Sequence, residues 1–439
     1  MAKVAHASPT KGFFVHMITK DISLEACILD LLDNSLDGAR GQLHRQGQQP
    51  NAPGGYEGFH VELTLDRERF TISDNCGGIP VEDAVNYAFH FGRREDADPE
   101  APYAIGLYGI GMKRAILKMG ETILVHSSTV DEAFSVPINV KKWLRDDDRW
   151  DFTLRELAPD AVAGTCIEVR RLYDGIAAEM NDPLFRDDLV EAIARDYSFF
   201  LLNGFRIAIN GIDVQPYRFA LRSGGDFEPI NTQFSEDGVE VRLVAGFASP
   251  PQDDIEPEAR PVMDPDYLGW FVICNDRVVL AADKTKETIW GNEFPVWHPQ
   301  YNGFMGLAFF TSANPGALPW TTTKRGVDAS NPVFRRAQTE MKNATRPFLQ
   351  YTQQRKESLD AAKAAEANAR PTAIADLTFR PAMALPKLNV PRVRLATIQY
   401  KRPLAEVAKV AESLGDRNLS FKDVGIRTFE FYLKEFAED

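Results

Sequence analysis

The sequence lacks any long apolar run. No stretch of about eighteen consecutive apolar residues, the length a membrane-spanning helix requires, occurs in the 439-residue chain. The opening MAKVAHASPTKGFF also lacks the basic segment and apolar core of a secretory leader. We therefore expect a cytoplasmic protein that has no membrane partner.

Cysteine is scarce, and acidic residues outnumber basic ones. The four cysteines lie far apart and form no C-x-x-C pair, which argues against a zinc site and against a disulfide framework. The net charge of −13 disfavours nucleic-acid binding over the whole surface, although it permits a local basic patch. The chain also contains no G-x-x-x-x-G-K-[ST] motif, so a P-loop is excluded.

Hydrophobic residues make up 44% of the chain, enough for at least two buried cores. Alternating or β-branched runs predict strands at 60–65, 70–74, 122–128, 133–140, 151–157 and 164–172. Apolar periodicity predicts helices at 23–45, 81–90, 110–119 and 182–202. Because few strands alternate strictly with helices, we predict an α+β fold in which helices cover a mixed sheet.

The pattern changes near residue 215. A second group of strands is predicted at 239–248, 268–280 and 304–312, and a long helix at 332–369. The proline-punctuated stretch that follows is typical of a linker. We therefore predict a first domain over 1–214, a second over 215–369, a linker over 370–394 and a small helical segment over 395–439.

One predicted helix carries an acidic stripe. In ILDLLDNSLDGAR, Asp30, Asn34 and Asp37 lie within about 40° of one another at roughly 100° per residue, and leucines occupy the other side. Such a stripe can be a solvated helix face. It can also be the wall of a site that handles a metal and a phosphate, and two later motifs favour this second interpretation.

The first of these motifs is SDNCGGIP. Asp74 ends a predicted strand, where its carboxylate can accept a hydrogen bond from an exocyclic amine. The glycines that follow can bring the backbone close to a flat ring. Alone, the motif is equally typical of a β-turn.

The second motif is IGLYGIGMKRAIL, in which Gly106, Gly109 and Gly111 precede a predicted helix. Glycines there allow amide groups and the helix N-terminus to face phosphate oxygens, with Lys113 beside them. The preceding 91–104 is polar and irregular, which fits a mobile lid better than the strand of a Rossmann turn.

Together these stretches resemble the GHKL ATPases, named after gyrase, the ninety-kilodalton heat-shock chaperone, histidine kinases and MutL. Within that superfamily they are most similar to the microrchidia (MORC) ATPases and their prokaryotic relatives. The resemblance implies a Bergerat-type two-layer α/β sandwich that binds ATP and Mg²⁺. A smaller α/β transducer domain and a short helical C-terminal segment would follow it.

The resemblance also implies roles for single residues. The family motif E-x-x-x-N-x-x-D-A matches DLLDNSLDGA, so Asn34 would hold Mg²⁺ and Asp30 would stand in the place of the general base. The motif D-x-G-x-G matches DNCGG, so Asp74 would bind the adenine amino group. The full set implied to bind the nucleotide is Asn34, Asp37, Asp74, Gly78, Ile79, Gly106, Gly109, Gly111, Met112, Lys113 and Thr165.

Two positions depart from the family motifs. Asp30 replaces a glutamate, which sets the carboxylate back by about 1.5 Å, one carbon–carbon bond, and a general base must come within hydrogen-bond reach of its water. Asp33 is the alternative base, although it lies roughly 60° around the helix. Cys76 replaces the first glycine of D-x-G-x-G, and we expect a structural thiol there rather than a reactive one.

The second group of strands resembles the transducer domain of the family. The segment GWFVICNDRVV (269–279) is similar to a microrchidia strand and turn. The segment LPWTTTKRGVD (318–328) matches a loop whose lysine reaches the γ-phosphate. We assign that catalytic role to Lys324, with Arg325 as the alternative. The loop can also be an exposed basic turn without such a role.

These features favour an ATP-gated homodimeric clamp that acts on DNA or in a defence or DNA-modification system. A non-hydrolysing nucleotide-binding scaffold and a chaperone-like ATPase remain alternatives. A DNA or protein partner could bind through 370–439, because the basic residues between Arg380 and Arg402 have no acidic residue among them and suit phosphate contact. Solvated linker charge is the simpler explanation of these residues. These basic residues are Arg380, Lys387, Arg392, Arg394, Lys401 and Arg402.

Overall fold

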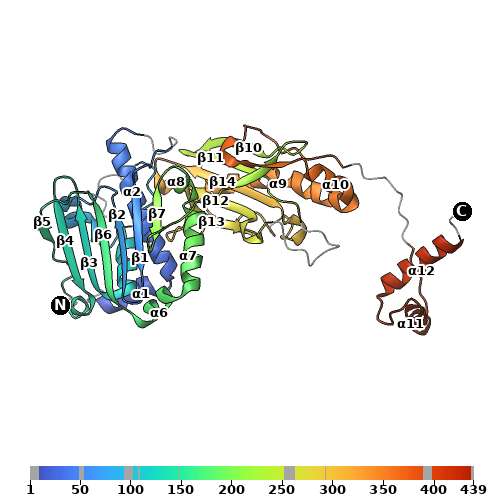
Figure 1. Cartoon of the computed structure of the whole chain (residues 1–439), viewed down its shortest axis with the longest axis horizontal. Coiled ribbons are helices and arrows are strands. Elements are labelled where there is room, and N and C mark those ends of the chain that lie inside the picture. Colours follow the sequence, from blue (N-terminus) through green and yellow to red (C-terminus); the bar gives the residue numbers. More distant parts are fainter. Residues whose placement is uncertain are drawn as a thin grey trace, which may run out of the picture. The chain divides into compact units, whose positions relative to one another are not determined.

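The computed structural model describes residues 9–48, 54–92, 102–106, 109–146, 148–251, 263–291, 293–388 and 398–436. The chain divides into two compact units, Met1–Asn389 and Val390–Asp439 (Figure 1). Helices and mixed sheets occur together in the first unit, which confirms the predicted α+β class. Every helix in the described ranges is too short or too polar to cross a membrane.

The first sheet has the strand order β5-β4-β3-β6-β2-β1-β7-β8. All neighbouring strands are antiparallel except β1 and β7, so the sheet is mixed. Its strands are β1 (His60–Leu65), β2 (Arg69–Asp74), β3 (Gly120–Ser128), β4 (Ala133–Asn139), β5 (Arg155–Leu157), β6 (Gly164–Leu172), β7 (Arg206–Ile209) and β8 (Ile212–Asp213). The predicted strands of the first half are present, with β5 shorter than expected, and β7 and β8 were not predicted.

Helices α1 (Lys11–Lys20), α2 (Leu24–Arg45) and α4 (Gly111–Met119) pack together beside this sheet (Figure 1). Helix α2 begins where predicted, because the Ser23 hydroxyl accepts a hydrogen bond from the Ala26 amide at 3.1 Å and caps the helix. Its leucines are buried in the core. Because this leucine face packs in the core, the rotation of α2 about its own axis is fixed.

Other predicted helices differ in detail. The stretch predicted at 81–90 forms the short α3 (Val81–Asp83) and a π-helical turn, η1 (Ala84–Ala88). The stretch predicted at 182–202 divides into α7 (Pro183–Asp196) and α8 (Ser198–Leu202), after α6 (Asp174–Asn181). The helix α5 (Val140–Leu144) follows β4 directly.

The second sheet has the order β10-β11-β14-β12-β13. The strands are β10 (Ile230–Glu236), β11 (Val239–Phe247), β12 (Gly269–Cys274), β13 (Arg277–Asp283) and β14 (Phe304–Thr311). A Cβ atom at Gly306 in β14 would lie 2.5 Å from the ring of the buried Trp270 in β12. Only glycine therefore lets the indole pack flat across the neighbouring strand.

The long helix predicted over 332–369 is interrupted at Ser358. It forms α9 (Pro332–Glu357), which packs on β11 and β14, and α10 (Leu359–Glu366). Inside the core, Arg355 of α9 donates to the Glu366 carboxylate at 2.7 Å, and both side chains are buried. This ion pair holds the two helices together.

Part of the stretch predicted as a linker is paired with the second sheet region. The strand β15 (Arg370–Ala373) runs antiparallel to β9 (Ala220–Ser223), and the backbones of Arg380 and Asn231 bond to each other. Proline disfavours helix but permits pairing at a strand edge. A proline-rich stretch that pairs in this way therefore has the same composition as a linker. The predicted division at residue 214 stays a prediction.

The second unit consists of α11 (Leu404–Ser413) and α12 (Phe421–Phe436), in line with the helical segment expected there. Of the basic residues noted above, Arg392 and Arg394 lie outside the described residues. Arg380 pairs with Glu228 at 3.3 Å, and Arg402 pairs with Glu406 at 3.3 Å. These two charges are therefore partly neutralised.

Candidate nucleotide-binding site

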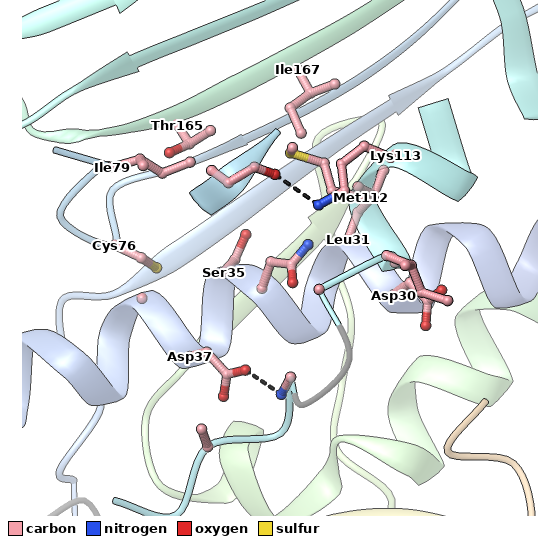
Figure 2. Close-up of a pocket in the computed structure, with 18 of the residues that line it drawn as sticks. Asp30, Leu31, Ser35, Asp37, Cys76, Ile79, Met112, Lys113, Thr165 and Ile167 are labelled. Atoms are coloured by element: carbon pink, nitrogen blue, oxygen red, sulfur yellow. Dashed lines mark hydrogen bonds between the residues drawn. The ribbon is translucent and has the colours of Figure 1, made fainter. Parts of the chain in front are cut away.

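One cavity of about 610 Å³ opens in the first unit between α2, the end of β2, the start of α4 and the loop that contains Lys324 (Figure 2). Every residue that we predicted for the site lines it. These residues are Asp30, Asn34, Asp37, Asp74, Gly78, Ile79, Gly106, Gly109, Gly111, Met112, Lys113, Thr165 and Lys324. Segments nearly 300 residues apart in sequence thus share one wall.

One end of the cavity is built around Asp74. Its carboxylate accepts hydrogen bonds from the Ser35 hydroxyl at 2.7 Å, the Cys76 amide at 2.9 Å and the Thr165 amide at 3.1 Å. Burial raises the pKa of Asp74, while these donors oppose the rise. The carboxylate is therefore held in one orientation at the wall of a partly apolar pocket, where it can accept from an exocyclic amine.

Glycine is required beside this carboxylate. Gly78 has a φ of 69°, and a Cβ atom there would lie 2.0 Å from the carbonyl oxygen of Ser128. The neighbouring Ile79 amide donates to the Ser127 hydroxyl at 2.8 Å, and that hydroxyl also bonds to Thr165 Oγ1 at 2.8 Å. Sequence reasoning missed Ser127, which belongs to no motif and reaches Thr165 only through the pairing of β3 with β6.

Asp37 and Asn34 on α2 differ sharply in their surroundings. Both oxygens of Asp37 are occupied, since they accept from the amides of Ile105 at 2.7 Å and Gly106 at 2.6 Å. The Asp37 carboxylate therefore anchors the glycine-rich loop (Figure 2). Asn34 is exposed to the cavity and bonds to no other described residue, which leaves its amide oxygen available.

This arrangement fits a magnesium ion bound together with phosphates. Mg²⁺ keeps several waters and takes only one or two protein ligands beside phosphate oxygens. No group of three or more His, Cys, Asp or Glu residues suited to a metal occurs in the ranges that the structure describes. A free amide oxygen at Asn34 is the kind of ligand that such a phosphate-bound ion uses.

Asp30 and Asp33, which also lie on α2, are buried and paired. Asp30 accepts from Arg114 Nη2 at 2.5 Å, and burial raises its pKa. Asp33 is 1% exposed and accepts from Lys324 Nζ at 2.9 Å and from the Tyr197 hydroxyl at 2.8 Å. With both oxygens engaged, Asp33 is poorly placed to serve as the alternative general base.

Asp33 belongs to a buried charge network. Arg277 Nε of β13 lies 3.3 Å from Asp33, and Arg277 Nη1 lies 3.1 Å from Asp196. Although burial opposes ionisation, the charges of Lys324 and Arg277 hold the pKa of Asp33 below its usual range. This network joins α2 to the second sheet, a role that the sequence patterns did not reveal.

The two lysines of the site occupy different surroundings. Lys113 Nζ donates to the carbonyl oxygen of Ala88 at 2.8 Å, and burial lowers its pKa to about 8. An approaching phosphate would favour its charged form. Lys324 has a φ of 55°, a left-handed conformation that is unusual outside glycine and often found at functional sites.

Arg325, the alternative to Lys324, points elsewhere. Its guanidinium pairs with Glu25 at 2.8 Å and is 33% exposed, and it does not line the cavity. The side chain of Lys324, by contrast, lines the cavity and is buried. The geometry therefore favours Lys324 as the residue that could meet a phosphate.

The turn between β12 and β13 reaches the loop that precedes Gly106. Asn275 and Asp276 have φ values of 47° and 66°, as in the tight turns of twisted hairpins. Arg40 of α2 donates to the Asn275 carbonyl at 2.8 Å and to Asp276 at 3.0 Å, and also to the carbonyl of Tyr103. The second sheet therefore holds one end of this loop, and no sequence signal pointed to Arg40.

Comparison with known proteins agrees with this geometry. Residues 22–160 match the family model described as histidine kinase-, DNA gyrase B-, and HSP90-like ATPase. The match supports the GHKL ATPase superfamily. It spans α2, the loop after β2 and the glycine-rich loop, and it ends before Thr165 and Lys324. No curated protein matches the chain, and the microrchidia resemblance stays a prediction.

The network around Asp33 leads to a stability prediction. Asp33→Asn keeps the size of the side chain but leaves Arg277 and Lys324 buried with too little negative charge. We expect the free energy of unfolding to fall by about 3–5 kcal/mol, as when one partner of a buried ion pair is removed. Urea denaturation measures this change.

A matched control for this variant is Asp66→Asn. Asp66 is a well-exposed carboxylate that pairs with Arg69 at 3.5 Å, so its loss should change stability by less than about 1 kcal/mol. If Asp33→Asn were no more destabilising than this surface change, the network would contribute nothing to joining the two sheets.

Proposed function

We propose that this protein binds ATP together with Mg²⁺ in the cavity and hydrolyses it slowly. The observation that carries the proposal is the shared cavity: a fixed carboxylate lies at one end, and Asn34, the start of α4 and two buried lysines lie toward the other. The GHKL match over residues 22–160 supports ATP binding independently.

The adenine would lie at the end built by Asp74. Its exocyclic amine would donate to the Asp74 carboxylate, and Thr165 would support the ring, since Thr165 is itself fixed by Ser127. Gly78 would allow the backbone to approach the flat base. Apolar contacts from Ile79 and Met112, which line the same cavity, would cover its faces.

The phosphates would lie at the N-terminus of α4. Backbone amides from Gly109 and Gly111 would face the phosphate oxygens, and Lys113 would exchange its carbonyl partner for one of them. Asn34 would hold Mg²⁺, which would neutralise phosphate charge. Lys324 would lie near the third phosphate and stabilise the charge that hydrolysis leaves there.

Asp30 would orient the attacking water as the general base. Its side chain is one methylene shorter than that of glutamate, which we take to be the reason for slow turnover. The same departure favours one alternative function, a scaffold that binds ATP without hydrolysis. Measuring both steady-state ATP turnover and nucleotide affinity distinguishes the hydrolase from the scaffold.

Asp74→Asn tests the binding assignment. The change replaces an acceptor oxygen by a donor that would face the adenine amine, so we expect loss of measurable ATP binding. Isothermal titration calorimetry provides the affinity, and Asp66→Asn on the surface serves as the control. Unchanged affinity in Asp74→Asn would contradict the placement of the base.

Asp30→Asn tests the hydrolysis assignment. ATP affinity should remain close to that of the parent protein, because Asp30 lies beside the phosphates rather than the base. Turnover should fall by about a hundredfold or more, the usual effect of losing a general base. A variant that turns ATP over at the parent rate would show that the base lies elsewhere.

We further propose an ATP-gated dimeric clamp. In this scheme the third phosphate draws Lys324 from Asp33 and orders the loop that Asp37 and Arg40 hold, and two copies then join through their ordered loops. The same proposal includes the resemblance to microrchidia ATPases and a cytoplasmic location. It also includes a DNA or protein partner that binds at 370–439. Of the basic residues that the structure describes between Arg380 and Arg402, Lys387 and Lys401 form no ion pair within 4.0 Å.

Lys324→Ala tests the clamp. Sedimentation with a non-hydrolysable ATP analogue should show a dimer for the parent protein and mostly monomer for this variant. Arg325→Ala, which changes the adjacent cation outside the cavity, should dimerise as the parent does. A dimer that forms regardless of nucleotide and of Lys324 would instead favour the scaffold.

A further inference from the structure

Arg114 has no part in the scheme above, yet it lines the cavity. It follows Lys113 on α4, one helical position further from the glycines. Its guanidinium contacts Asp30 across the two helices, with Nη2 2.5 Å from Oδ2, and the two side chains are only 10% and 7% exposed. The contact is thus a buried ion pair between a cation and the proposed general base.

The contact bears on the charge of Asp30. A general base must be ionised in order to accept a proton, but burial disfavours the ionised form and raises the pKa of Asp30. Lys324 and Arg114 oppose that rise, whereas Asp33 adds to it, and the buried Cys27 thiol is the other titratable neighbour on α2. Lys324 is hydrogen-bonded to Asp33, so Arg114 is the cation in direct contact with Asp30.

The contact also bears on the orientation of Asp30. Its Oδ2 is held by Arg114, whereas Oδ1 accepts no hydrogen bond from another described residue and remains available to water. Gly111 packs against the same carboxylate, since a Cβ atom there would lie 3.4 Å from it. Within the described residues, the Nε of Arg114 has no hydrogen-bond partner, so Asp30 is the anion that holds this guanidinium.

We propose that Arg114 is a positioning residue for Asp30, which it keeps ionised and turned so that the free oxygen meets the attacking water. This inference rests on the proposed hydrolysis of ATP and adds a residue to it. Arg114 acts through Asp30 and need not touch the nucleotide.

The test compares the full-length parent protein with Arg114→Gln and Arg114→Lys. The first readout is the titration of Asp30 itself, followed by ¹³C NMR of carboxyl-labelled aspartate and assigned by the signal that Asp30→Asn removes. Loss of a contacting cation should raise the midpoint by about one pH unit or more in Arg114→Gln. Arg114→Lys should restore much of the parent value.

The second readout is kcat as a function of pH. Since the reaction needs ionised Asp30, a higher pKa moves the acidic limb of the profile to higher pH. Arg114→Gln should therefore lose about tenfold or more of the turnover in the acidic limb, one factor of ten per pH unit, and regain part of it in alkaline solution. Lys324 is unchanged in these variants, so any shift reports the Arg114 contact.

Arg355→Gln is the matched control. It also removes a buried arginine from an ion pair, at 2.7 Å from Glu366, but Arg355 does not line the cavity. The acidic limb of its kcat–pH profile should lie at the same pH as that of the parent protein, even if the stability of the variant is lower. Thermal denaturation of all variants separates loss of fold from loss of positioning.

Each of the following results would overturn the inference. An Asp30 titration that does not move in Arg114→Gln would show that the cation does not hold the charge. Faster turnover in that variant would show that Arg114 obstructs the base, and lost ATP affinity would make Arg114 a nucleotide contact. Absence of turnover in the parent protein would refute the proposed hydrolysis itself, and the role of Arg114 with it. If the parent turns over ATP but the acidic limb of the pH profile does not move in Arg114→Gln, only the role of Arg114 is refuted.

Discussion

The burial of acidic side chains along one helix is the constraint on which the rest of this structure depends. Helix α2 places Asp30 and Asp33 inside the protein and Asp37 in the wall of the cavity, where an unpaired carboxylate would cost several kcal/mol in lost hydration. Each finds a different partner: Arg114 of α4, the cations Arg277 and Lys324, and the amides of the loop at 105–106. The fold brings those partners together, and the cavity forms where they meet.

This pairing explains why the candidate site belongs to both sheets. Arg277 begins β13 and Lys324 lies in the loop after β14, yet both reach Asp33 on α2. A phosphate that attracted Lys324 would alter the charge around Asp33 and thereby the contact between the sheets. Such a link would give a bound nucleotide a physical means of changing how the two sheets contact each other, which the proposed clamp requires.

The contacts around the glycine-rich loop extend the same logic. Asp37 holds the loop from one side, and the turn at Asn275 and Asp276 holds it through Arg40 from the other. A family match that stops at residue 160 covers the helix and the loop but not the elements of the second sheet that hold them. The contacts that Arg277, Lys324 and the turn at Asn275 and Asp276 make with α2 therefore come from beyond the matched segment.

Local sequence patterns determined much of the fold. Apolar periodicity and the Ser23 cap specified α2, alternating residues specified most strands, and the glycine motifs marked loops that do line one cavity. These signals are short-range, since each depends on residues a few positions apart. The pairing of residues 370–373 with β9 was not predictable from the sequence. Proline indicates that the stretch is not helical, but it does not reveal which strand edge the chain pairs with.

Only the tertiary structure decided how the charged residues of the site are used. Helical geometry placed Asp30 and Asp37 on one face, but it could not show that Asp37 would hold the loop or that Asp33 would be fully engaged. The partner of Asp30 lies 84 residues away and the lysine of Asp33 lies 291 residues away. Ion pairs over such separations leave no periodic trace in a sequence, because they depend on how whole elements pack and on which buried charge most needs compensation.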